Sequence, residues 1–572
     1  MLFVGGVAQE ARLIPRVGAV LLMGTTLAAC NADRPSCVGN GCAWSSAEWA
    51  RLHSLSWAPV EMDAGVPVTP PPDPSNRFFD TPGAASLGKL FYFDPRFSGN
   101  TTLVDSIGRS VSSARSPKGS PADVSCASCH NPTHAGTDVT SMPNTVSIGA
   151  GIYDVNGQQT LNAAFFPLLY WNGRSDSLWA QALAVNESGF SMNGTRLQTF
   201  WTIVDYYLDR YTAVFGDPLP QKITSAEFPL SGKPGTTPDC VNERPKFPFD
   251  CMTDTDQEIV SRVFVNFGKA IAAYEDTLVS RDSPFDKFVR DGPGSDWISD
   301  AAKRGAMLFV GKASCIDCHN GPLLSDTKFH NIGVPQSGEH VPTVADCPPG
   351  GACDCTPGAE VSTCAPSGAW AGALKLNAAT ESKNVKNDFR RDSKPWSDNP
   401  GGIEPCATTE IGAQPACGAP SDPLDPSLKG AWRTPSLRDV ALTAPYMHDG
   451  YYETLTQVVQ HYNMGGASSA ATAFQLPVCG TVDAAAPACM APDAGAHQAA
   501  EIKPLDLSDD EVSDLVAFLG TLTGAPLSKD ASANPDLPSA SAFQEVGDAG
   551  GFVLNEGGVP PDGGAPDAGA SQ

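Results

Sequence analysis

Two Cys-x-x-Cys-His pentapeptides carry the most specific chemistry in this sequence. They are Cys126-Ala-Ser-Cys129-His130 and Cys315-Ile-Asp-Cys318-His319. The two thiols of such a motif can form thioether bonds to the vinyl groups of one haem, and the adjacent His then ligates the iron. A redox-active Cys pair does not need the following His, and a zinc site usually needs a second ligand pair nearby. The sequence therefore predicts two covalently bound haem c groups, with His130 and His319 as iron ligands.

Acidic residues outnumber basic ones in this chain of 572 residues. The 63 Asp and Glu against 37 Lys and Arg give a net charge of −26, which argues against nucleic acid and an anionic membrane surface as partners. This charge can attract a basic electron-donor protein, although a solvated acidic surface is the alternative. The 55 Gly and 50 Pro residues indicate long irregular connections, and the length indicates more than one domain.

The first thirty residues have the pattern of an export signal. Arg12 and Arg16 precede an apolar stretch over 17–29, which is too short to span a bilayer. The stretch ends in Leu27-Ala-Ala-Cys30, which resembles a bacterial lipoprotein box and implies cleavage and lipidation at Cys30. An ordinary cleaved signal with a chance Cys is the alternative. We expect a protein held by lipid on the periplasmic side of a bacterial membrane.

The cysteine count agrees with export to an oxidising compartment. Of 17 Cys, Cys30 and the four haem thiols leave 12, and an even remainder suggests disulfides. The predicted local pairs are Cys240 with Cys251, Cys406 with Cys417, Cys479 with Cys489, and Cys37 with Cys42. Two further bridges, or alternatively a metal-binding cluster, are predicted for Cys347, Cys353, Cys355 and Cys364.

Composition and apolar spacing divide the chain into five predicted segments. They are an export signal at 1–29, a Pro-rich tether at 30–77, an N-terminal haem domain at 78–295, a C-terminal haem domain at 296–525 and a disordered tail at 526–572. Three stretches without periodicity are predicted loop insertions, at 229–255, 336–428 and 466–503.

Helical spacing predicts the elements that must position the two haem motifs. Apolar residues over 257–279 predict a helix that closes the first half, and 299–309 predicts a short helix leading into the second motif. Ser508 and Glu511 form a capping box before the last helix of the second half. The predicted fold is therefore mainly α, with two cytochrome c-like helical haem domains and long disulfide-bearing loop insertions.

Four segments around these motifs resemble the bacterial dihaem cytochrome c peroxidases and their MauG branch. They are Leu87-Gly-Lys-Leu-Phe-Tyr-Phe-Asp-Pro-Arg-Phe-Ser98, Tyr170-Trp-Asn-Gly-Arg-Ser-Asp-Ser-Leu178, Lys328-Phe-His-Asn-Ile-Gly333 and Arg433-Thr-Pro-Ser-Leu-Arg-Asp-Val-Ala-Leu-Thr-Ala-Pro-Tyr-Met-His-Asp-Gly450. The resemblance covers about residues 85–525 apart from the insertions.

The resemblance implies a division of labour between the two haems. The haem on His130 corresponds to the peroxide site and the haem on His319 to the electron entry site. Trp171 corresponds to an electron relay between them, and a core aromatic is the alternative. The resemblance also implies a calcium ion between the domains, and the matching positions are Asn156, Thr443 and Pro445.

The family's second haem has a Met or a Tyr as its distal ligand, and that position falls on Tyr462. Met464 is the rival ligand, and a surface Tyr is the other alternative. A phenolate stabilises ferric iron and lowers the reduction potential, whereas a thioether raises it. Tyr462 is the residue found in the MauG branch.

The first haem motif departs from the peroxidase pattern in two ways. Where resting peroxidases carry a distal His, this sequence has Ala150, and His134 is the nearest spare His. The family's catalytic Gln corresponds to Gln181, but its distal acid falls on Ser191. Glu187 is the candidate substitute for this acid, because cleavage of bound peroxide needs a proton donor.

Other polar residues in the matching segments have weaker assignments. Arg174, Arg433 and Arg438 are candidate partners for haem propionates, with surface ion pairs as the alternative. His448 and His330 are candidates for hydrogen bonds at a haem edge, with a satisfied core His as the alternative.

The resemblance implies an oxidoreductase that reduces hydrogen peroxide with electrons from a small donor, a cytochrome c or a cupredoxin. A MauG-like oxidase acting on a protein or organic substrate is the alternative, and a non-catalytic electron carrier is the third hypothesis. The family also often forms homodimers.

Overall fold

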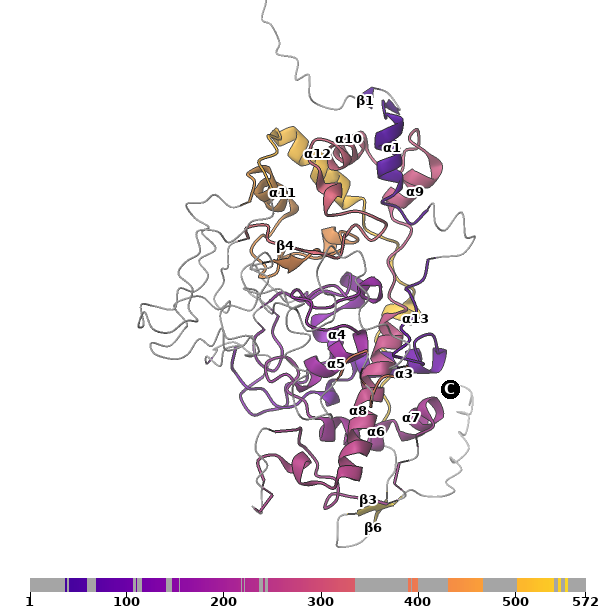
Figure 1. The fold of residues 1–572 in the computed structure, drawn as a ribbon, viewed down its shortest axis with the longest axis vertical. Helices are drawn as coiled ribbons and strands as arrows, with labels where there is room; N and C mark the ends of the chain where they lie inside the picture. Colours follow the sequence, from indigo (N-terminus) through magenta and orange to yellow (C-terminus); the bar gives the residue numbers. More distant parts are fainter. Residues whose placement is uncertain are drawn as a thin grey trace, which may run out of the picture. The chain divides into compact units, whose positions relative to one another are not determined.

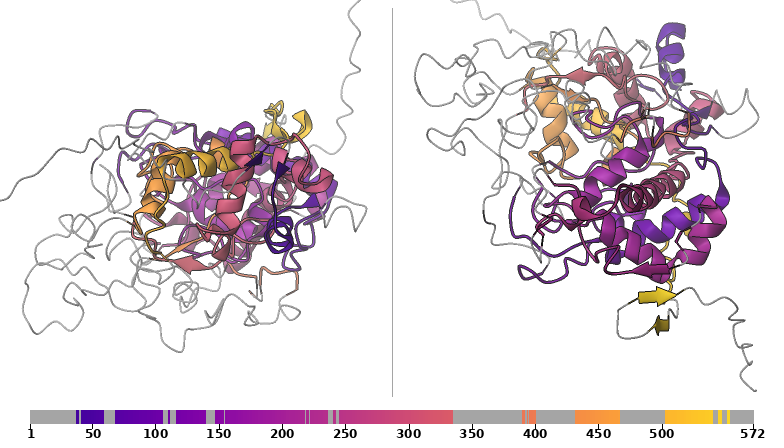
Figure 2. Two further views of the ribbon diagram at one scale, coloured as in Figure 1. Left: turned by 90° about the horizontal axis from the view of Figure 1, so that it is seen from above. Right: turned by 60° about the horizontal axis from the view of Figure 1, so that its bottom comes forward.

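The computed structural model describes residues 41–334, 389–399, 431–466 and 502–539, apart from short gaps within these ranges, and short strands at 37–38, 544–546 and 551–553. Helices dominate this part of the chain from each direction of view (Figures 1 and 2), so the prediction of a mainly α fold is confirmed. None of the helices within these ranges is long and apolar enough to cross a membrane.

The α-helices of the described residues are α1 (Ser46–His53), α3 (Pro82–Phe93), α4 (Cys126–Cys129), α5 (Leu178–Glu187), α6 (Arg196–Tyr206), α7 (Leu208–Phe215), α8 (Asp254–Glu275), α9 (Pro284–Asp291), α10 (Asp300–Val310), α11 (Leu455–Asn463), α12 (Asp509–Gly520) and α13 (Lys529–Ser532). The 3-10 turns are η1 (Pro95–Phe97), η2 (Pro132–His134), η3 (Ala163–Phe165), η4 (Pro248–Cys251), η5 (Cys315–Asp317) and η12 (Val440–Leu442). The three helices expected from the sequence are therefore present, as α8, α10 and α12.

The first half is built around α8, which runs beside α3 and α5 (Figure 1). Thr253 caps α8 by accepting a hydrogen bond from the backbone N of Asp256. Gly88 lets α3 cross α8 at close range, because a Cβ at this position would lie 1.8 Å from the backbone oxygen of Ala270. The apolar residues of these helices form one continuous core.

The second half repeats this arrangement with α10 and α12. Ser299 caps α10, and the predicted capping box of Ser508 and Glu511 at the start of α12 is confirmed. Gly305 permits the crossing, since a Cβ there would lie 1.9 Å from the backbone oxygen of Asp514. The core of this half also takes up Phe285 and Phe288 of α9, so the change from one core to the other falls before α9 and not at 295.

Parts of the predicted tether and tail pack on the two cores. Leu52 of α1 and the nearby Leu55 are fully buried in the second core. In the predicted tail, the backbone oxygen of Ala531 accepts a hydrogen bond of 2.6 Å from the Tyr274 hydroxyl. The expectation of a free tether over all of 30–77 and a disordered tail over all of 526–572 is therefore wrong for these segments, because each finds partners far away in the sequence.

Short strand pairs join distant segments. They are β1 (Cys37–Val38) with β2 (Gly41–Cys42), β4 (Phe329–His330) with β5 (Trp432–Arg433), and β3 (Lys222–Thr224) with β7 (Gly551–Val553), which also pairs with β6 (Gln544–Val546). All are antiparallel. In the β4–β5 pair, His330 lies opposite Trp432, so segments on either side of the predicted insertion at 336–428 pair with each other.

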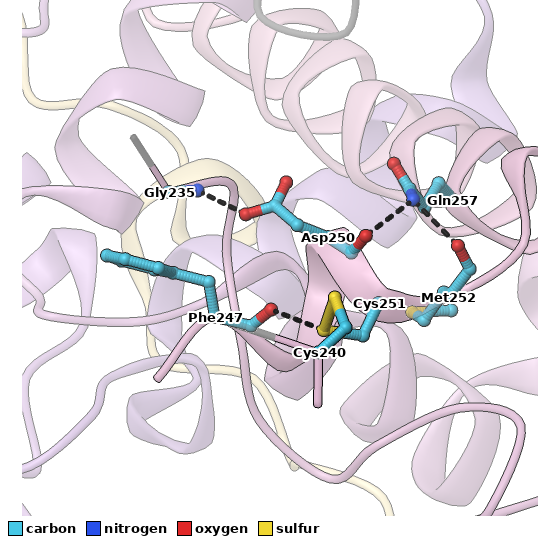
Figure 3. Close-up of a disulfide and its surroundings, with 7 residues drawn as sticks. All are labelled: Gly235, Cys240, Phe247, Asp250, Cys251, Met252 and Gln257. Atoms are coloured by element: carbon cyan, nitrogen blue, oxygen red, sulfur yellow. Dashed lines mark hydrogen bonds between the residues drawn. A yellow bond between two sulfur atoms is a disulfide. The ribbon is translucent and has the colours of Figure 1, made fainter. Parts of the chain in front are cut away.

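One predicted disulfide, Cys240–Cys251, is confirmed (Figure 3). It lies in the insertion at 229–255, where the Asp250 carboxylate accepts a hydrogen bond from the backbone N of Gly235. The backbones of Cys37 and Cys42 are register partners in the β1–β2 pair. The remaining predicted bridges and the lipidated Cys lie outside the described residues, at Cys347, Cys353, Cys355, Cys364, Cys406, Cys417, Cys479, Cys489 and Cys30.

A buried ion pair ties α9 to the segment that follows β5. The Arg438 guanidinium, which is fully buried, donates hydrogen bonds of 2.6 and 3.1 Å to the two carboxylate oxygens of Asp286. Burial raises the pKa of Asp286, but Arg438 and the hydroxyls of Ser56 and Ser283 outweigh this effect and hold the pKa below 3.8. The stabilising contribution is therefore present above that pH and is lost as the pH falls through the lowered value.

The substitution Arg438→Leu should lower the free energy of unfolding by about 3 to 5 kcal/mol, because it leaves the Asp286 carboxylate buried without a cation. Urea unfolding at neutral pH measures this loss. Arg51→Ala is the control, because it removes an exposed pair with Asp317 and should cost no more than about 1 kcal/mol. Equal losses in the two variants would contradict the prediction.

Candidate functional site

Both Cys-x-x-Cys-His motifs line one cavity of about 400 Å³, a volume typical of cofactor sites. Each motif contributes both thiols and its His to the wall, and the wall also takes residues from α5, α8, α11 and α12. The Cys of each motif are free rather than joined in a disulfide. Free thiols facing a large, mostly apolar cavity are what covalent attachment of haem requires.

Hydrogen bonds orient the two predicted iron ligands in the same way. Nδ1 of His130 lies 3.1 Å from the backbone oxygen of Gly136, and Nδ1 of His319 lies 3.0 Å from that of Leu324. A ring that donates from Nδ1 keeps Nε2 available as a metal ligand. Burial lowers the pKa of both His130 and His319, which favours the neutral imidazole that ligation needs. These residues fit a haem in each motif.

Arg433 supplies a buried cation to the same cavity. Its Nε donates a hydrogen bond of 3.3 Å to the backbone oxygen of Tyr170, and its guanidinium carbon lies 3.8 Å from the centre of the Phe166 ring. Nη1 is buried without a hydrogen-bond partner among the described residues, and burial lowers the pKa of Arg433 to about 9. A buried guanidinium aimed into the cavity suits the propionate groups of a haem.

The other two predicted propionate partners do not line this cavity. Arg438 is committed to Asp286 and to the backbone oxygens of Pro322 and Leu55. Arg174 hydrogen-bonds Asn172 and Tyr153, and its guanidinium carbon lies 3.4 Å from the centre of the Tyr170 ring. The sequence prediction is therefore wrong for Arg438, because a carboxylate distant in the sequence occupies its guanidinium.

Trp171 lies on the cavity wall where the two halves meet. Its Nε1 donates a hydrogen bond of 2.8 Å to the backbone oxygen of Asn156, and its own backbone oxygen accepts one of 2.8 Å from Arg433. The ring centre of Trp171 is 6.5 Å from that of His448. These contacts come from both halves, so they fix the indole between the two motifs.

His448 is a buried neutral ring rather than a charged one. It stacks on Trp432 with ring centres 4.1 Å apart, and burial lowers the pKa of His448 to about 3. His330, by contrast, lies beside the second motif with Nε2 2.8 Å from the Asp326 carboxylate. Burial lowers the pKa of His330, but hydrogen bonds to Asp326 and Cys318 outweigh it and raise the pKa to about 10.

Tyr462 is the titratable residue among the four of α11 that line the cavity. Burial raises the pKa of its phenol, and the neighbouring Cys315 and Cys318 thiols raise it further, so the side chain lies close to the second motif. The Nε2 atom of the neighbouring His461 lies 2.8 Å from the backbone oxygen of Ile332, and this contact holds the ring. Met464 is 61% exposed and does not line the cavity, which removes it as the rival ligand.

Gln181 and Ser191 line the cavity near the first motif, but Glu187 does not. The Glu187 carboxylate forms two hydrogen bonds of 2.9 Å with the fully buried Arg196 guanidinium. This ion pair makes Glu187 unsuitable as the substitute acid, which corrects that sequence prediction. His134 is exposed and likewise outside the cavity wall, whereas Ala150 is fully buried behind it.

The structure brings together the residues predicted to bind calcium. The side-chain Nδ2 of Asn156 donates a hydrogen bond of 2.6 Å to the backbone oxygen of Pro445. The backbone N of Asn156 donates a hydrogen bond to the backbone oxygen of His448. Thr443 and Pro445 line the same cavity.

Glu275 is a cavity residue that the sequence interpretation missed. It is the last residue of α8, is 5% exposed and lines the cavity together with Cys126. Burial raises the pKa of Glu275 to about 8. The sequence feature that could have revealed Glu275 is its place in the apolar stripe of the predicted helix, four residues after Ile271 and directly after Tyr274.

Comparisons with known proteins agree with this site. A family model described as "Di-haem cytochrome c peroxidase" matches residues 82–231. Cytochrome-c peroxidase IdrP2 of Denitromonas iodatirespirans is 28% identical over 450 residues, which cover 79% of this chain and 84% of that protein. Methylamine utilization protein MauG of Methylorubrum extorquens is 26% identical over 459 residues, which cover 80% and 82%.

Among solved structures, the diheme peroxidase BthA from Burkholderia thailandensis has 20% sequence identity and a TM-score of 0.46, and the match covers 81% of this chain and 92% of that one. An alignment that covers 79% of this chain necessarily spans both haem motifs. The resemblance that the four segments indicated is therefore confirmed. The chain is similar to dihaem cytochrome c peroxidases and MauG proteins over about four fifths of its length.

Proposed function

We propose that this protein is a dihaem c-type oxidoreductase that reduces hydrogen peroxide with electrons from a small donor protein, a cytochrome c or a cupredoxin. The main support for this proposal is that both motifs line one cavity. Each motif presents two free thiols and a His whose Nδ1 contacts a backbone oxygen. Each haem, when bound, supplies an iron that can store and transfer one electron. Conversion of one peroxide to two waters consumes two electrons and two protons, which accounts for two centres.

The protein's own residues make the two centres unequal. Tyr462 faces the second motif and is the proposed sixth ligand there, which suits a site for electron entry rather than for peroxide. Gln181 and Ser191 line the cavity with the first motif, and Ala150 stands where resting peroxidases carry a distal His. The first site is therefore the proposed place of peroxide binding, with Gln181 positioned to orient it.

Trp171 is the proposed electron relay between the two centres. Its indole Nε1 donates a hydrogen bond to the backbone oxygen of Asn156, and its backbone oxygen accepts one from the backbone N of Arg433, so its position does not depend on either haem. Electron transfer becomes slower with distance and with loose geometry. A fixed aromatic ring on the wall that both motifs share suits that role.

Two alternatives rest on specific residues. A MauG-like oxidase, which acts on a protein or organic substrate, is favoured by Tyr462 and by Ala150 in place of a distal His. A non-catalytic electron carrier is favoured by Ser191, because serine is a poor proton donor and Glu187 is paired with Arg196.

Stopped-flow mixing of the holoprotein with peroxide, with and without a reduced donor, separates these functions. A rapid spectral change that a donor reverses supports the peroxidase. A long-lived oxidised state that a donor does not discharge supports the oxidase. A spectrum that peroxide leaves unchanged would contradict both and leave the electron carrier.

The cellular context is also part of the proposal. The apolar stretch before Cys30 supports export and a lipid anchor on the periplasmic side of a membrane. The carbonyls of Thr443 and Pro445 with Asn156 support a calcium ion between the halves. A homodimer is proposed on the family likeness alone.

Tyr462→Met should replace an anionic ligand with a thioether and raise the potential of the second haem within the roughly 0.8 V range that axial ligands span. Spectroelectrochemistry of the holoprotein measures the shift. Met464→Leu is the matched control, because this residue is exposed and should leave the potential unchanged. A Tyr462 variant with the wild-type spectrum and potential would exclude Tyr ligation.

Ser191→Glu should restore an acid to the cavity wall and accelerate the reaction with peroxide by about 10²-fold or more, the usual gain from a positioned proton donor. The rate of the first spectral change in stopped flow checks it. In the control Ser191→Gln, the new side chain has the size of Glu but no acidic group, so the reaction with peroxide should not become faster. If both variants react equally, the missing acid is not what limits turnover.

Calcium at about 100 times its dissociation constant should raise the free energy of unfolding by about 2.7 kcal/mol. The comparison is between unfolding of the holoprotein with added calcium and with a chelator. Asn156→Ala should abolish the response. A response that survives in this variant would place the ion elsewhere.

A further inference from the structure

Glu275 is an acid in the wall of the first haem site, and no cation among the described residues offsets its burial. Its Oε2 is buried without a hydrogen-bond partner in the part of the chain that the structure describes. The carboxyl group ends α8 and lines the cavity with Cys126, one of the two thiols of the first motif. An acid with no partner in such a place is costly, so its retention needs an explanation.

The buried acids of α12 in the second half are paired, and none of them occupies the position of Glu275. The helix α12 crosses α10 as α8 crosses α3, and Leu519 stands at the cavity position that Glu275 has on α8. Asp514 forms hydrogen bonds of 2.7 and 2.8 Å with Arg304. Glu511 on the same helix receives hydrogen bonds of 3.0 and 3.2 Å from Lys312. Glu275 is thus a feature of the first haem site and not of the helix arrangement that both halves share.

The titratable groups around Glu275 come from three helices. They are Tyr92 of α3, Cys126 of α4 and Tyr274 of α8. Tyr92 donates its hydroxyl to the backbone oxygen of His130 at 2.7 Å, and Tyr274 donates to that of Ala531 at 2.6 Å. Neither phenol stabilises a carboxylate at Glu275. From α5 the wall receives Gln181 and Ala182, which do not titrate.

These neighbours stay neutral over the ordinary pH range. Burial raises the pKa of both Tyr92 and Tyr274 above 10, and a thioether at Cys126 does not titrate at all. Glu275 is the group of this set that changes charge, because burial raises its pKa to about 8 and no cation opposes that shift. Two charges in an interior of low dielectric interact much more strongly than in water.

We propose that Glu275 is the proton-binding site linked to reduction of the haem held at Cys126. When that centre gains one electron from the donor, the Glu275 carboxylate takes one proton from solvent and becomes a carboxylic acid. When the electron leaves for peroxide, the proton leaves the carboxyl group. The added negative charge is thereby neutralised within the cavity, and no covalent bond to the haem changes. The proposal rests on the proposed function, since it needs the haem of the first motif.

A spectroelectrochemical titration of the holoprotein tests the proposal between about pH 6 and about pH 9, the range around the raised carboxyl pKa. One proton taken up with one electron lowers the potential of the first haem by about 59 mV per pH unit, the value for a tenfold change in a one-electron equilibrium. The positive charge of a ferric centre favours the carboxylate, so the carboxyl pKa is lower in the oxidised protein than in the reduced protein. We expect this slope in the wild type between those two pKa values, and a flat potential in Glu275→Gln. The potential of the second haem is an internal reference and should respond to pH equally in both proteins.

Asp276→Asn is the matched control. Asp276 is the adjacent residue, caps α8 and has a pKa raised to about 7, first by burial and then by Asp80, but it does not line the cavity. This variant should keep the wild-type slope. Glu275→Asp keeps the carboxyl group and should also keep a slope, which separates loss of the proton site from loss of folding.

Redox difference infrared spectra give a second readout that needs no turnover. Reduction of the wild type should produce a carboxylic-acid carbonyl band that shifts in heavy water and is absent from Glu275→Gln. A slope that persists in Glu275→Gln would assign the proton to the haem propionates and overturn the proposal, as would a flat potential in the wild type. Absence of a c-type haem spectrum would instead contradict the proposed function itself.

Discussion

The close crossing of two helices in each half is the constraint on which the haem sites depend. In the first half Gly88 of α3 meets the backbone of α8, and in the second Gly305 of α10 meets the backbone of α12. A Cβ at either place would lie within 2 Å of a carbonyl oxygen, so any other residue would push the helices apart. Because α8 and α12 carry parts of the cavity wall, these two contacts set the width of the space that receives the motifs.

Local patterns in the sequence predicted most of the framework. The haem motifs, α8, α10, the capping box of α12 and the Cys240–Cys251 bridge all depend on residues close together in the chain, where spacing alone is informative. The family resemblance added Trp171 and Tyr462, which the structure places on the cavity wall. Their roles stay predictions, since position on a wall does not establish ligation or electron transfer.

The residues whose roles were predicted wrongly form contacts that the sequence does not reveal. Their partners are far away in the chain, or the side chain could have turned to either of two partners. Arg438 was a candidate for a propionate, yet Asp286 lies 152 residues away and takes its guanidinium. Glu187 and Arg196 are only nine residues apart, but nothing in the sequence shows that the carboxylate at the end of α5 would turn toward α6 and not toward the cavity. The burial of Leu52 in the second core has the same origin. Such contacts form only when the whole chain is folded.

The charges of the cavity indicate a structure shaped for its cofactors. Arg433 is a buried cation with an unpaired Nη1, and burial lowers its pKa to about 9. Glu275 is a buried acid whose folded state holds its proton more tightly than the unfolded chain does. The sign of that shift means that stability falls as the pH rises from about 4.5 towards 8, because the unfolded chain loses the proton first.

In the protein without haem, the burial of Arg433 and the burial of Glu275 both lower stability without serving a function. Haem propionates would give Arg433 an anionic partner, which no described residue gives to its Nη1. Haem attachment should therefore offset the free-energy cost of burying the Arg433 guanidinium. Among the described residues no cation pairs with Glu275, whereas the buried acids Asp514 and Glu511 of α12 pair with Arg304 and Lys312. The unequal treatment of equivalent helices is the reason to assign Glu275 to the chemistry of the first site and not to the stability of the fold.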